Sequence, residues 1–560
     1  MTRTGAAATP VERLREQLLA AVAALGGESA AVAGRGAVTL ERPPRAQLGD
    51  YSSNAALLLA PGLREQPRAL AQRLGEALAL ELGAGLERFE VAGPGFLNLF
   101  LADSWLGEAL AQALAAGEGF GGGGAETGER VLVEFVSANP TGPMHVGHAR
   151  NAAYGDALAR ILAFRGDRVE REFYVNDAGS QVRKLGESIG ALARGRAVPE
   201  DGYQGDYVAE LAPRIAGAAE LDAAAVGREA VAIMVAGIAQ ALAEFGVSFD
   251  SWAYESALHA GDPSPVAHTL ALLSEQGHTY TSEGALWLRT TDFGDDKDRV
   301  LVRSNGEHTY FASDIAYHQD KRERGFERQI DVWGADHHGY VQRMKAAYRA
   351  LGGDPDELEL LIMQLVHLVS AGARAQMSKR AGDFVTLAEL LREIGVDAAR
   401  WYLLARSHDT TVELDLDLAR EQSSENPVYY VQYAHARISS ILARAGAERV
   451  GAALAEAAEA ARRGEPLDAT ERALIELLLA FPGEVAEAAA RRAPHRIAAY
   501  ALELAQGFTA FYRDCRVIGV EEGEDGGRSL ESSRIALCVA SRRTIARSLA
   551  LLGVGAPQEM

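Results

Sequence analysis

The sequence predicts an α/β protein of three domains, in which a domain with a parallel sheet lies between a small α+β domain and an all-helical domain. The 560 residues are more than one hydrophobic core normally organises. Strand-like and helix-like segments alternate in the middle of the chain, as they do in βαβ units. After residue 420, nearly every segment has the apolar spacing of a helix.

Residues 1–115 are expected to form the α+β domain. The segment VERLREQLLAAVAAL has helical periodicity, and FEVAGPGFLNLFL is typical of short strands. Residues 116–130 are rich in glycine, which predicts a flexible linker to the next domain.

The parallel-sheet domain is predicted to span residues 131–420. It begins with two strands, VLVEFV and RVEREFYV, separated by a helix from His148 to about Arg165. A strand–helix–strand unit of this length requires parallel strands, so we expect a Rossmann-like nucleotide fold.

Two later segments provide further strands, QIDVWG at 329–334 and LIMQLVHLV at 361–369. The stretch from about 185 to 300 is interpreted as an insertion between the two halves of the fold. The last domain, residues 421–560, is predicted to be a helical bundle.

Composition excludes several classes of protein. The net charge of −21 argues against indiscriminate binding to polyanions. Only Cys515 and Cys538 are present, so there is neither a disulfide framework nor a cysteine-type zinc site. The N-terminus lacks a signal peptide's apolar segment, and no run of 18 apolar residues occurs. A cytoplasmic protein without membrane contact is expected.

The loop SANPTGPMHVGH joins the first strand to its helix, where ligands collect in open parallel sheets. His145 and His148 are three residues apart and share a face of the first helical turn, where both can donate to phosphate. Gly147 lets a flat group approach the backbone. A metal pair is the alternative, but no third ligand at zinc-type spacing follows, so no resident metal is expected.

A second motif, Gln376 followed by Met377, Ser378, Lys379 and Arg380, places two cations in a small-residue loop. Such a loop can close over a triphosphate, although alone it is usually a solvated turn. Together, the HxGH and MSK motifs resemble the signature pair of class I aminoacyl-tRNA synthetases.

The details resemble arginyl-tRNA synthetases over nearly the whole chain. EFVSANPTGPMHVGHARNAAYGDALARIL, FYVNDAGSQ, YFASDIAYH, DAARWYLL and NPVYYVQYAHARI are similar to that family's segments in order, and GDYSSNAALLLA and GPGFLNLFL to its N-terminal domain. The resemblance implies a cytoplasmic, monomeric arginine–tRNA ligase that uses ATP with Mg²⁺ and no tightly bound cofactor. It also implies that tRNA must bind before arginine is activated.

The resemblance also implies roles for individual residues. The ATP-binding set is Pro143, His145, Gly147, His148, Gly334, Asp336, His337, Val369, Met377, Ser378 and Lys379, of which His145, Gly147, His148 and Lys379 are the catalytic residues. The arginine-binding set is Glu134, Ser137, Asn139, His148, Tyr310, Asp314 and Gln342. Gln376 stands where the family commonly has lysine, so Lys379 alone is credited with phosphate contact.

Elementary chemistry supports some of these roles. Glu134 is a carboxylate in an apolar strand, so it must be paired or functional. Tyr310 and Asp314 are four apart and share a helix face, although without the resemblance Asp314 would be interpreted as a surface acid. Asn176 and Asp177 end the second strand as site residues or as turn formers.

The helical domain is expected to bind the tRNA anticodon. Tyr429, Tyr433 and Tyr512 could stack unpaired bases, as could Tyr430, while Arg437 contacts phosphate, although half of these four tyrosines are expected to be bundle core instead. The N-terminal domain would touch the tRNA elbow by resemblance.

Three alternatives remain open. A cysteine-specific class I synthetase should carry a zinc site, and a glutamate-specific one should lack the N-terminal domain. A small nucleotidylyltransferase would not need the helical domain. A non-catalytic binding protein should have lost His145, His148 or Lys379, and all three are present.

Overall fold

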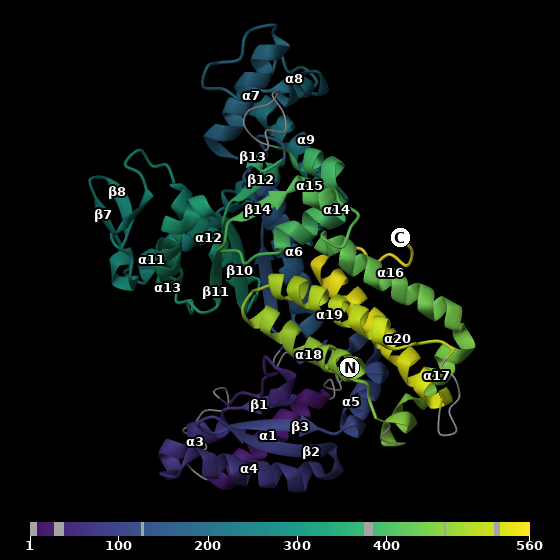
Figure 1. Ribbon diagram of the computed structural model, residues 1–560. Coiled ribbons are helices and arrows are strands. Elements are labelled where there is room, and N and C mark those ends of the chain that lie inside the picture. The colour runs from purple at the N-terminus through teal and green to yellow at the C-terminus, as the bar shows by residue number, and fades with distance from the viewer. Residues whose placement is uncertain (1–7, 27–37, 125–127, 375–384, 464–465, 520–526) are drawn as a thin grey trace.

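The structure, a computed structural model, describes residues 8–26, 38–124, 128–374, 385–463, 466–519 and 527–560 (Figure 1). A parallel sheet occupies the middle of the molecule. The N-terminal domain lies at one end, beside the C-terminal bundle, and helices α7, α8 and α9 project at the other end. The predicted fold class is confirmed.

The N-terminal domain packs helices on a small antiparallel sheet of order β1-β3-β2. Leucines of the helices and of β3 form its core, because one face of each element is apolar. Its elements are α1 (Pro10–Gly26), β1 (Tyr51–Ser53), α3 (Ala55–Leu63), α4 (Pro67–Leu82), β2 (Leu86–Ala92) and β3 (Phe96–Leu101). Helix α5 (Asp103–Ala116) leads out of the domain.

The central sheet has five strands in the order β11-β10-β4-β5-β6, all parallel. Its elements are β4 (Arg130–Glu134), α6 (Val146–Arg165), β5 (Arg168–Val175), β6 (Ser251–Tyr254), α12 (Tyr310–Glu323), β10 (Arg328–Gly334), α13 (Val341–Ala350) and β11 (Leu358–Met363). The central strands β4 and β10 are mostly buried and largely apolar, apart from Glu134, Gln329 and Asp331. All five strands run in the same direction. Every strand therefore delivers the loop after it to the same edge.

Two details differ from expectation. LIMQLVHLV at 361–369 forms two strands in different sheets, because β11 ends at Met363 and β12 (Val366–Ser370) pairs with β13 (Ala373–Arg374) and β14 (Val412–Asp415). The stretch 185–300 is not one insertion, because β6 lies inside it and forms an edge of the central sheet.

Around β6, the chain folds into two separate pieces. Before it, α7 (Gly179–Ala193), α8 (Asp206–Leu211) and α9 (Ala223–Glu244) pack around their own core. After it come α10 (Glu255–Leu258), α11 (Pro265–Glu275) and the antiparallel sheet of β7 (Thr279–Ser282), β8 (Ala285–Leu288) and β9 (Arg299–Val302).

Among the described residues, α9 is the one helix long and apolar enough to cross a membrane, by length and composition alone. It is packed tightly against α7 instead. A Cβ added at Gly186 would lie 1.8 Å from the carbonyl oxygen of Ala223, and one at Gly227 would lie 2.4 Å from that of Val182. These glycines let the two backbones approach each other closely.

The C-terminal region is a helical bundle joined to the parallel-sheet domain by α14 (Leu387–Leu404) and α15 (Leu416–Arg420). The bundle consists of α16 (Pro427–Ala445), α17 (Ala447–Arg463), α18 (Ala469–Ala490), α19 (His495–Asp514) and α20 (Gly527–Leu552). Arg400 of α14 is fully buried, where it donates to the carbonyl of Leu552 and pairs with Asp156 of α6. The bundle is thereby tied to the helix that begins at the HxGH loop.

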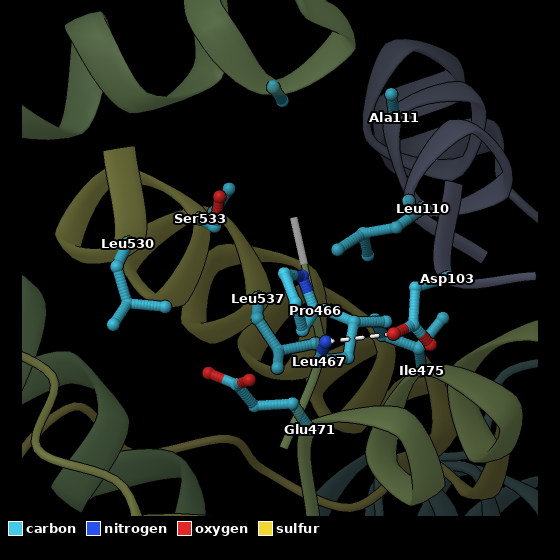
Figure 2. A pocket seen from close by; sticks show the side chains of 13 residues that line it. Asp103, Leu110, Ala111, Pro466, Leu467, Glu471, Ile475, Leu530, Ser533 and Leu537 are labelled. Carbon is cyan, nitrogen blue, oxygen red and sulfur yellow. Dashed lines mark hydrogen bonds between the residues drawn. The ribbon is translucent and has the colours of Figure 1, made fainter. Parts of the chain in front are cut away.

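The N-terminal domain is held on the bundle by Arg472 of α18. Its guanidinium pairs with Asp50 at 2.7 Å and Asp103 at 2.5 Å, and donates to the carbonyl of Leu101. Figure 2 shows the neighbouring cavity between α5, α18 and α20, at whose rim Asp103 accepts the backbone N–H of Leu467 at 3.0 Å.

We predict that Arg472→Met lowers the free energy of unfolding by about 1–3 kcal/mol, because it leaves the buried carboxylate of Asp50 without its cation. Thermal unfolding followed by circular dichroism checks this. Arg73→Met, which breaks an exposed pair with Glu65, is the control and should cost less than about 1 kcal/mol. Equal losses in both variants would contradict the assignment of Arg472 as the interdomain contact.

Candidate active site

The HxGH loop forms the N-terminus of α6. His145 is the N-cap, and its Nδ1 accepts the N–H of Gly147 at 3.1 Å, while the N–H of His145 donates to Nδ1 of His148 at 3.3 Å. The rings stack with centroids 3.6 Å apart. A Cβ on Gly147 would lie 3.0 Å from the His145 ring, so a larger residue would press on the capping imidazole. The loop thus places two imidazoles side by side, as predicted.

Both imidazoles are neutral at pH 7. Burial lowers the pKa of His145, and burial together with the neighbouring His145 lowers the pKa of His148 to about 3. Because each Nδ1 accepts a backbone N–H, the ring proton of each histidine is on Nε2. The pair is suited to donate hydrogen bonds to an anion without carrying a charge.

These histidines line a cavity of about 850 Å³ at the carboxyl edge of the sheet. The sequence-predicted residues that line it are Ser137, Asn139, His145, Gly147, His148, Gly334, Asp336 and His337. Residues Met363 to Leu368 also line it. Three loops far apart in sequence therefore meet in one cleft.

Other predicted residues lie elsewhere. Pro143 is exposed in the HxGH loop, and Val369 is in β12, one residue beyond the lining segment. Gln376, Met377, Ser378, Lys379 and Arg380 lie outside the described residues.

The turn after β4 has strained backbone. Val136 and Ser137 have φ angles of 70° and 43°, which non-glycine residues rarely adopt. Asn151 of α6 secures the turn, since its Oδ1 accepts the N–H of Val136 at 2.7 Å and its Nδ2 donates to the carbonyl of Val332. The strain directs Ser137 toward Glu134, whose Oε1 accepts its hydroxyl at 2.7 Å.

A second group of predicted side chains, outside the lining of this cavity, is acidic. Tyr310 begins α12 and is half exposed, and Asp314 follows one turn later. The Tyr340 hydroxyl donates to Oδ2 of Asp314 at 2.5 Å, and burial raises the pKa of Asp314. Gln342 donates to the carbonyl of Gly294. Asp314 is therefore not the surface acid that sequence alone would favour.

Glu255 belongs to this group, although it was not predicted as a site residue from the sequence. It begins α10 directly after β6, where burial and then the charges of Asp314 and Asp177 raise its pKa to about 7. Asp177 follows β5 and accepts both the N–H and the hydroxyl of Ser256. Three carboxyl groups, from the ends of two strands and from α12, thus converge. Asp177 and Glu255 each lie just after a parallel strand, which is a typical position for a site residue. The sequence could have indicated Glu255 in this way only if β6 had been predicted as a strand.

Asn176 follows β5 beside this group, and its Oδ1 is buried with no hydrogen-bond partner among the described residues. A buried acceptor without a donor is costly unless a ligand satisfies it. This acidic group therefore suits a cation with several N–H donors.

Beneath the cleft, Glu134 is paired, one of the two outcomes predicted for it. Lys321 of α12 donates to Oε2 of Glu134 at 2.7 Å and to Oδ1 of Asp331 at 2.8 Å. Burial raises the pKa of Glu134, and Lys321 opposes that rise. Burial would raise the pKa of Asp331 too, but Lys321 and His318 hold it below the usual range.

The C-terminal aromatic residues divide into two groups. Tyr433 and Tyr512 are each 39% exposed, and the guanidinium of Arg437 lies 4.8 and 5.5 Å from their ring centroids. Tyr429 stacks on Tyr433. Tyr430 instead packs against the core and donates to Thr509. The first group forms an exposed aromatic and basic surface on α16 and α19.

Comparison with protein families matches three consecutive parts of the chain. An arginyl-tRNA synthetase N-terminal domain matches residues 12–101, a class I (R) tRNA synthetase catalytic domain matches 109–193 and 261–439, and a DALR anticodon-binding domain matches 431–560.

Similar proteins cover nearly the whole chain. An arginine–tRNA ligase of Frankia alni is 47% identical over 93% of this chain and 95% of its own, and one of Desulfosudis oleivorans is 45% identical over 98% and 100%. The arginyl-tRNA synthetase structure from Thermus thermophilus is 25% identical, with a TM-score of 0.76 over 98% of this chain and 99% of its own. The chain therefore belongs to the arginyl-tRNA synthetase family of class I.

Proposed function

We propose that the cleft at the carboxyl edge of the central sheet activates arginine with ATP and transfers arginine to the 3′-terminal adenosine of tRNA. The observation that carries this is that two kinds of chemistry lie at the carboxyl edge of one sheet. The cavity there holds two neutral imidazole donors, and the carboxyl groups of Asp314, Glu255 and Asp177 converge outside its lining, on α12 and after β5 and β6. The overall reaction is the arginine–tRNA ligase reaction of the family.

ATP occupies the imidazole end. Nε2–H groups of His145 and His148 donate to phosphate oxygens, and the ribose and adenine lie against Gly334, Asp336, His337 and main chain near Val369. Pro143 shapes the loop. Lys379, with Met377 and Ser378, is assigned to the phosphates from the sequence motif.

Arginine occupies the acidic end. Asp314 and Glu255 take the guanidinium, because a planar fork pairs well with carboxylates, and Tyr310 packs beside it. Glu134, Ser137 and Asn139 take the α-ammonium group, and Gln342 lies at the edge of the site. This arrangement points the carboxylate of arginine toward His148.

The reaction needs no protein nucleophile. The arginine carboxylate attacks the α-phosphorus of ATP, the bond to the β-phosphate oxygen breaks, and diphosphate leaves with Mg²⁺ that entered with ATP. The terminal ribose hydroxyl of tRNA then attacks the activated carbonyl and loses its proton, and AMP leaves. The residues contribute positioning and charge neutralisation.

The tRNA extends over both outer domains. Tyr429, Tyr433, Arg437 and Tyr512 form the anticodon contact surface, and the N-terminal domain, residues 1–115, reaches the tRNA elbow. Each domain has one task in this scheme. Residues 1–115 contact the tRNA elbow, residues 131–420, after the linker at 116–130, carry out the reaction, and residues 421–560 bind the anticodon. The chain acts as a monomer in the cytoplasm.

ATP–pyrophosphate exchange tests this function. We expect exchange with arginine only when tRNA is present, because the family resemblance implies that tRNA binding precedes activation. Each of the other amino acids, with and without tRNA, serves as a control. Exchange that responds to a different amino acid would overturn the proposal.

We predict that Asp314→Asn lowers kcat/KM for arginine by about 10²–10³-fold, because the guanidinium loses a charged partner in a partly buried site. The KM for ATP should change less than about twofold. Steady-state exchange kinetics measure both. Glu323→Gln, on the same helix but bonded to exposed Gln319, is the matched control and should resemble the parent.

Arginine binding should strengthen as pH rises. Glu255 has a pKa of about 7 in the empty site, so it is largely protonated at pH 6 and ionised at pH 8, and only the ionised form pairs with a guanidinium. We expect Kd for arginine to fall up to about tenfold per pH unit below pH 7 and to level off above it. Calorimetry across pH 6–8 measures this, and Glu255→Gln should flatten the profile. A parent profile that is already flat would remove Glu255 from the pocket.

A further inference from the structure

Three buried carboxylates stand side by side across the sheet. The register pairs Asp331 of β10 with Glu134 of β4, and Glu134 with Glu172 of β5. Their exposed fractions are 0%, 6% and 1%. Successive side chains alternate between faces, so residues in direct register point to the same face. We call these three residues the carboxylate row.

Helix α12 supplies the cations of the carboxylate row. Lys321, itself 0% exposed, bridges Glu134 and Asp331 with contacts of 2.7 and 2.8 Å. Arg324 forms a bidentate pair with Glu172, and the Tyr317 hydroxyl donates to the same carboxylate at 2.7 Å. Of these residues, Lys321 is the one that contacts carboxylates on two different strands, β4 and β10.

The network continues to the other end of the arginine site. Nε2 of His318 lies 2.8 Å from Asp331, and Nδ1 lies 2.7 Å from the carbonyl of Asp314. A carbonyl only accepts, so Nδ1–H donates to Asp314. The other ring nitrogen, Nε2, faces the Asp331 carboxylate. The chain of contacts therefore runs from Glu134 through Lys321, Asp331 and His318 to the backbone of Asp314.

We propose that Lys321 is a positioning residue that fixes the distance between the ammonium-binding and guanidinium-binding ends of the site, and so selects side-chain length. This rests on the roles proposed above for Glu134 and Asp314. Lys321 touches neither substrate, but it holds the carboxylate that meets the α-ammonium group. Through Asp331 and His318, it also holds the turn of α12 that carries Asp314.

The physical reason for length selection is rigidity. An apolar pocket distinguishes one methylene group by only about 10–200-fold. A site with two charged ends at a fixed separation also leaves one end unpaired when the ligand is too short or too long. A misplacement of about 1 Å can cost about 10²-fold in rate. Freeing one end should therefore lower selectivity as well as rate.

The test uses Lys321→Met in the full-length enzyme. Exchange kinetics are measured with tRNA present for arginine, for homoarginine with one more methylene, and for 2-amino-4-guanidinobutyrate with one fewer. We expect kcat/KM for arginine to fall about 100-fold and the preference for arginine over each homologue to fall at least about tenfold. The KM for ATP should stay within about twofold of the parent value.

Lys345→Met is the matched control. Lys345 is a partly buried lysine of α13 that donates to the carbonyls of Pro355 and Leu358 and forms no ion pair within the part of the chain that the structure describes. It should keep the parental preference among the three amino acids. Lys321→Arg keeps the positive charge but has a side chain of different length and shape. It should therefore recover part of kcat/KM for arginine, while its preference among the three amino acids stays altered. It replaces Lys321→Met in the test if that variant does not fold.

An unchanged preference in both Lys321 variants would overturn the inference, and so would a loss of ATP binding parallel to the loss of arginine use. Exchange kinetics of the parent enzyme and of Asp314→Asn distinguish failure of the proposed function from failure of the role proposed for Lys321. If the parent uses arginine and Asp314→Asn does not, the proposed function stands whatever the Lys321 variants show. If the parent does not use arginine, the proposed function itself fails.

Discussion

Burial of the carboxylate row is the constraint on which the catalytic domain depends. Three adjacent parallel strands place Asp331, Glu134 and Glu172 in register on one face, and an uncompensated buried charge costs several kcal/mol. Helix α12 and its C-cap provide the compensation through Lys321 and Arg324. The position of α12 over the sheet is therefore set by charge as well as by apolar packing.

The proposed arginine site follows from that placement. Tyr310 and Asp314 are on the first turns of the same helix, so fixing its later turns on the carboxylate row also fixes them. The proposed ATP site is built differently, because its histidines are held by backbone capping. Strand β4 carries Glu134, and the strained turn after it, which Asn151 secures, brings Ser137 to that carboxylate.

Much of this could be predicted from sequence because it is local. The βαβ unit, the shared face of His145 and His148, and the need for Glu134 to be paired all depend on neighbouring residues or on one strand. Glu255 and Lys321 could not be identified in the same way, because their partners come from other strands. The strand β6 has only four residues, which is too short to show a clear alternating pattern. The segment LIMQLVHLV is apolar throughout, so its sequence does not show where one strand ends and the next begins. The role of Lys379, outside the described residues, stays a prediction.

A double-mutant cycle on Lys321 and Asp314 tests the central claim most directly. The affinity for arginine is measured for the parent, Lys321→Met, Asp314→Asn and the double variant. If the carboxylate row positions the guanidinium site, Asp314→Asn should cost much less once Lys321 is gone, with a coupling energy above about 1 kcal/mol. Additive losses, within about 0.5 kcal/mol, would contradict it.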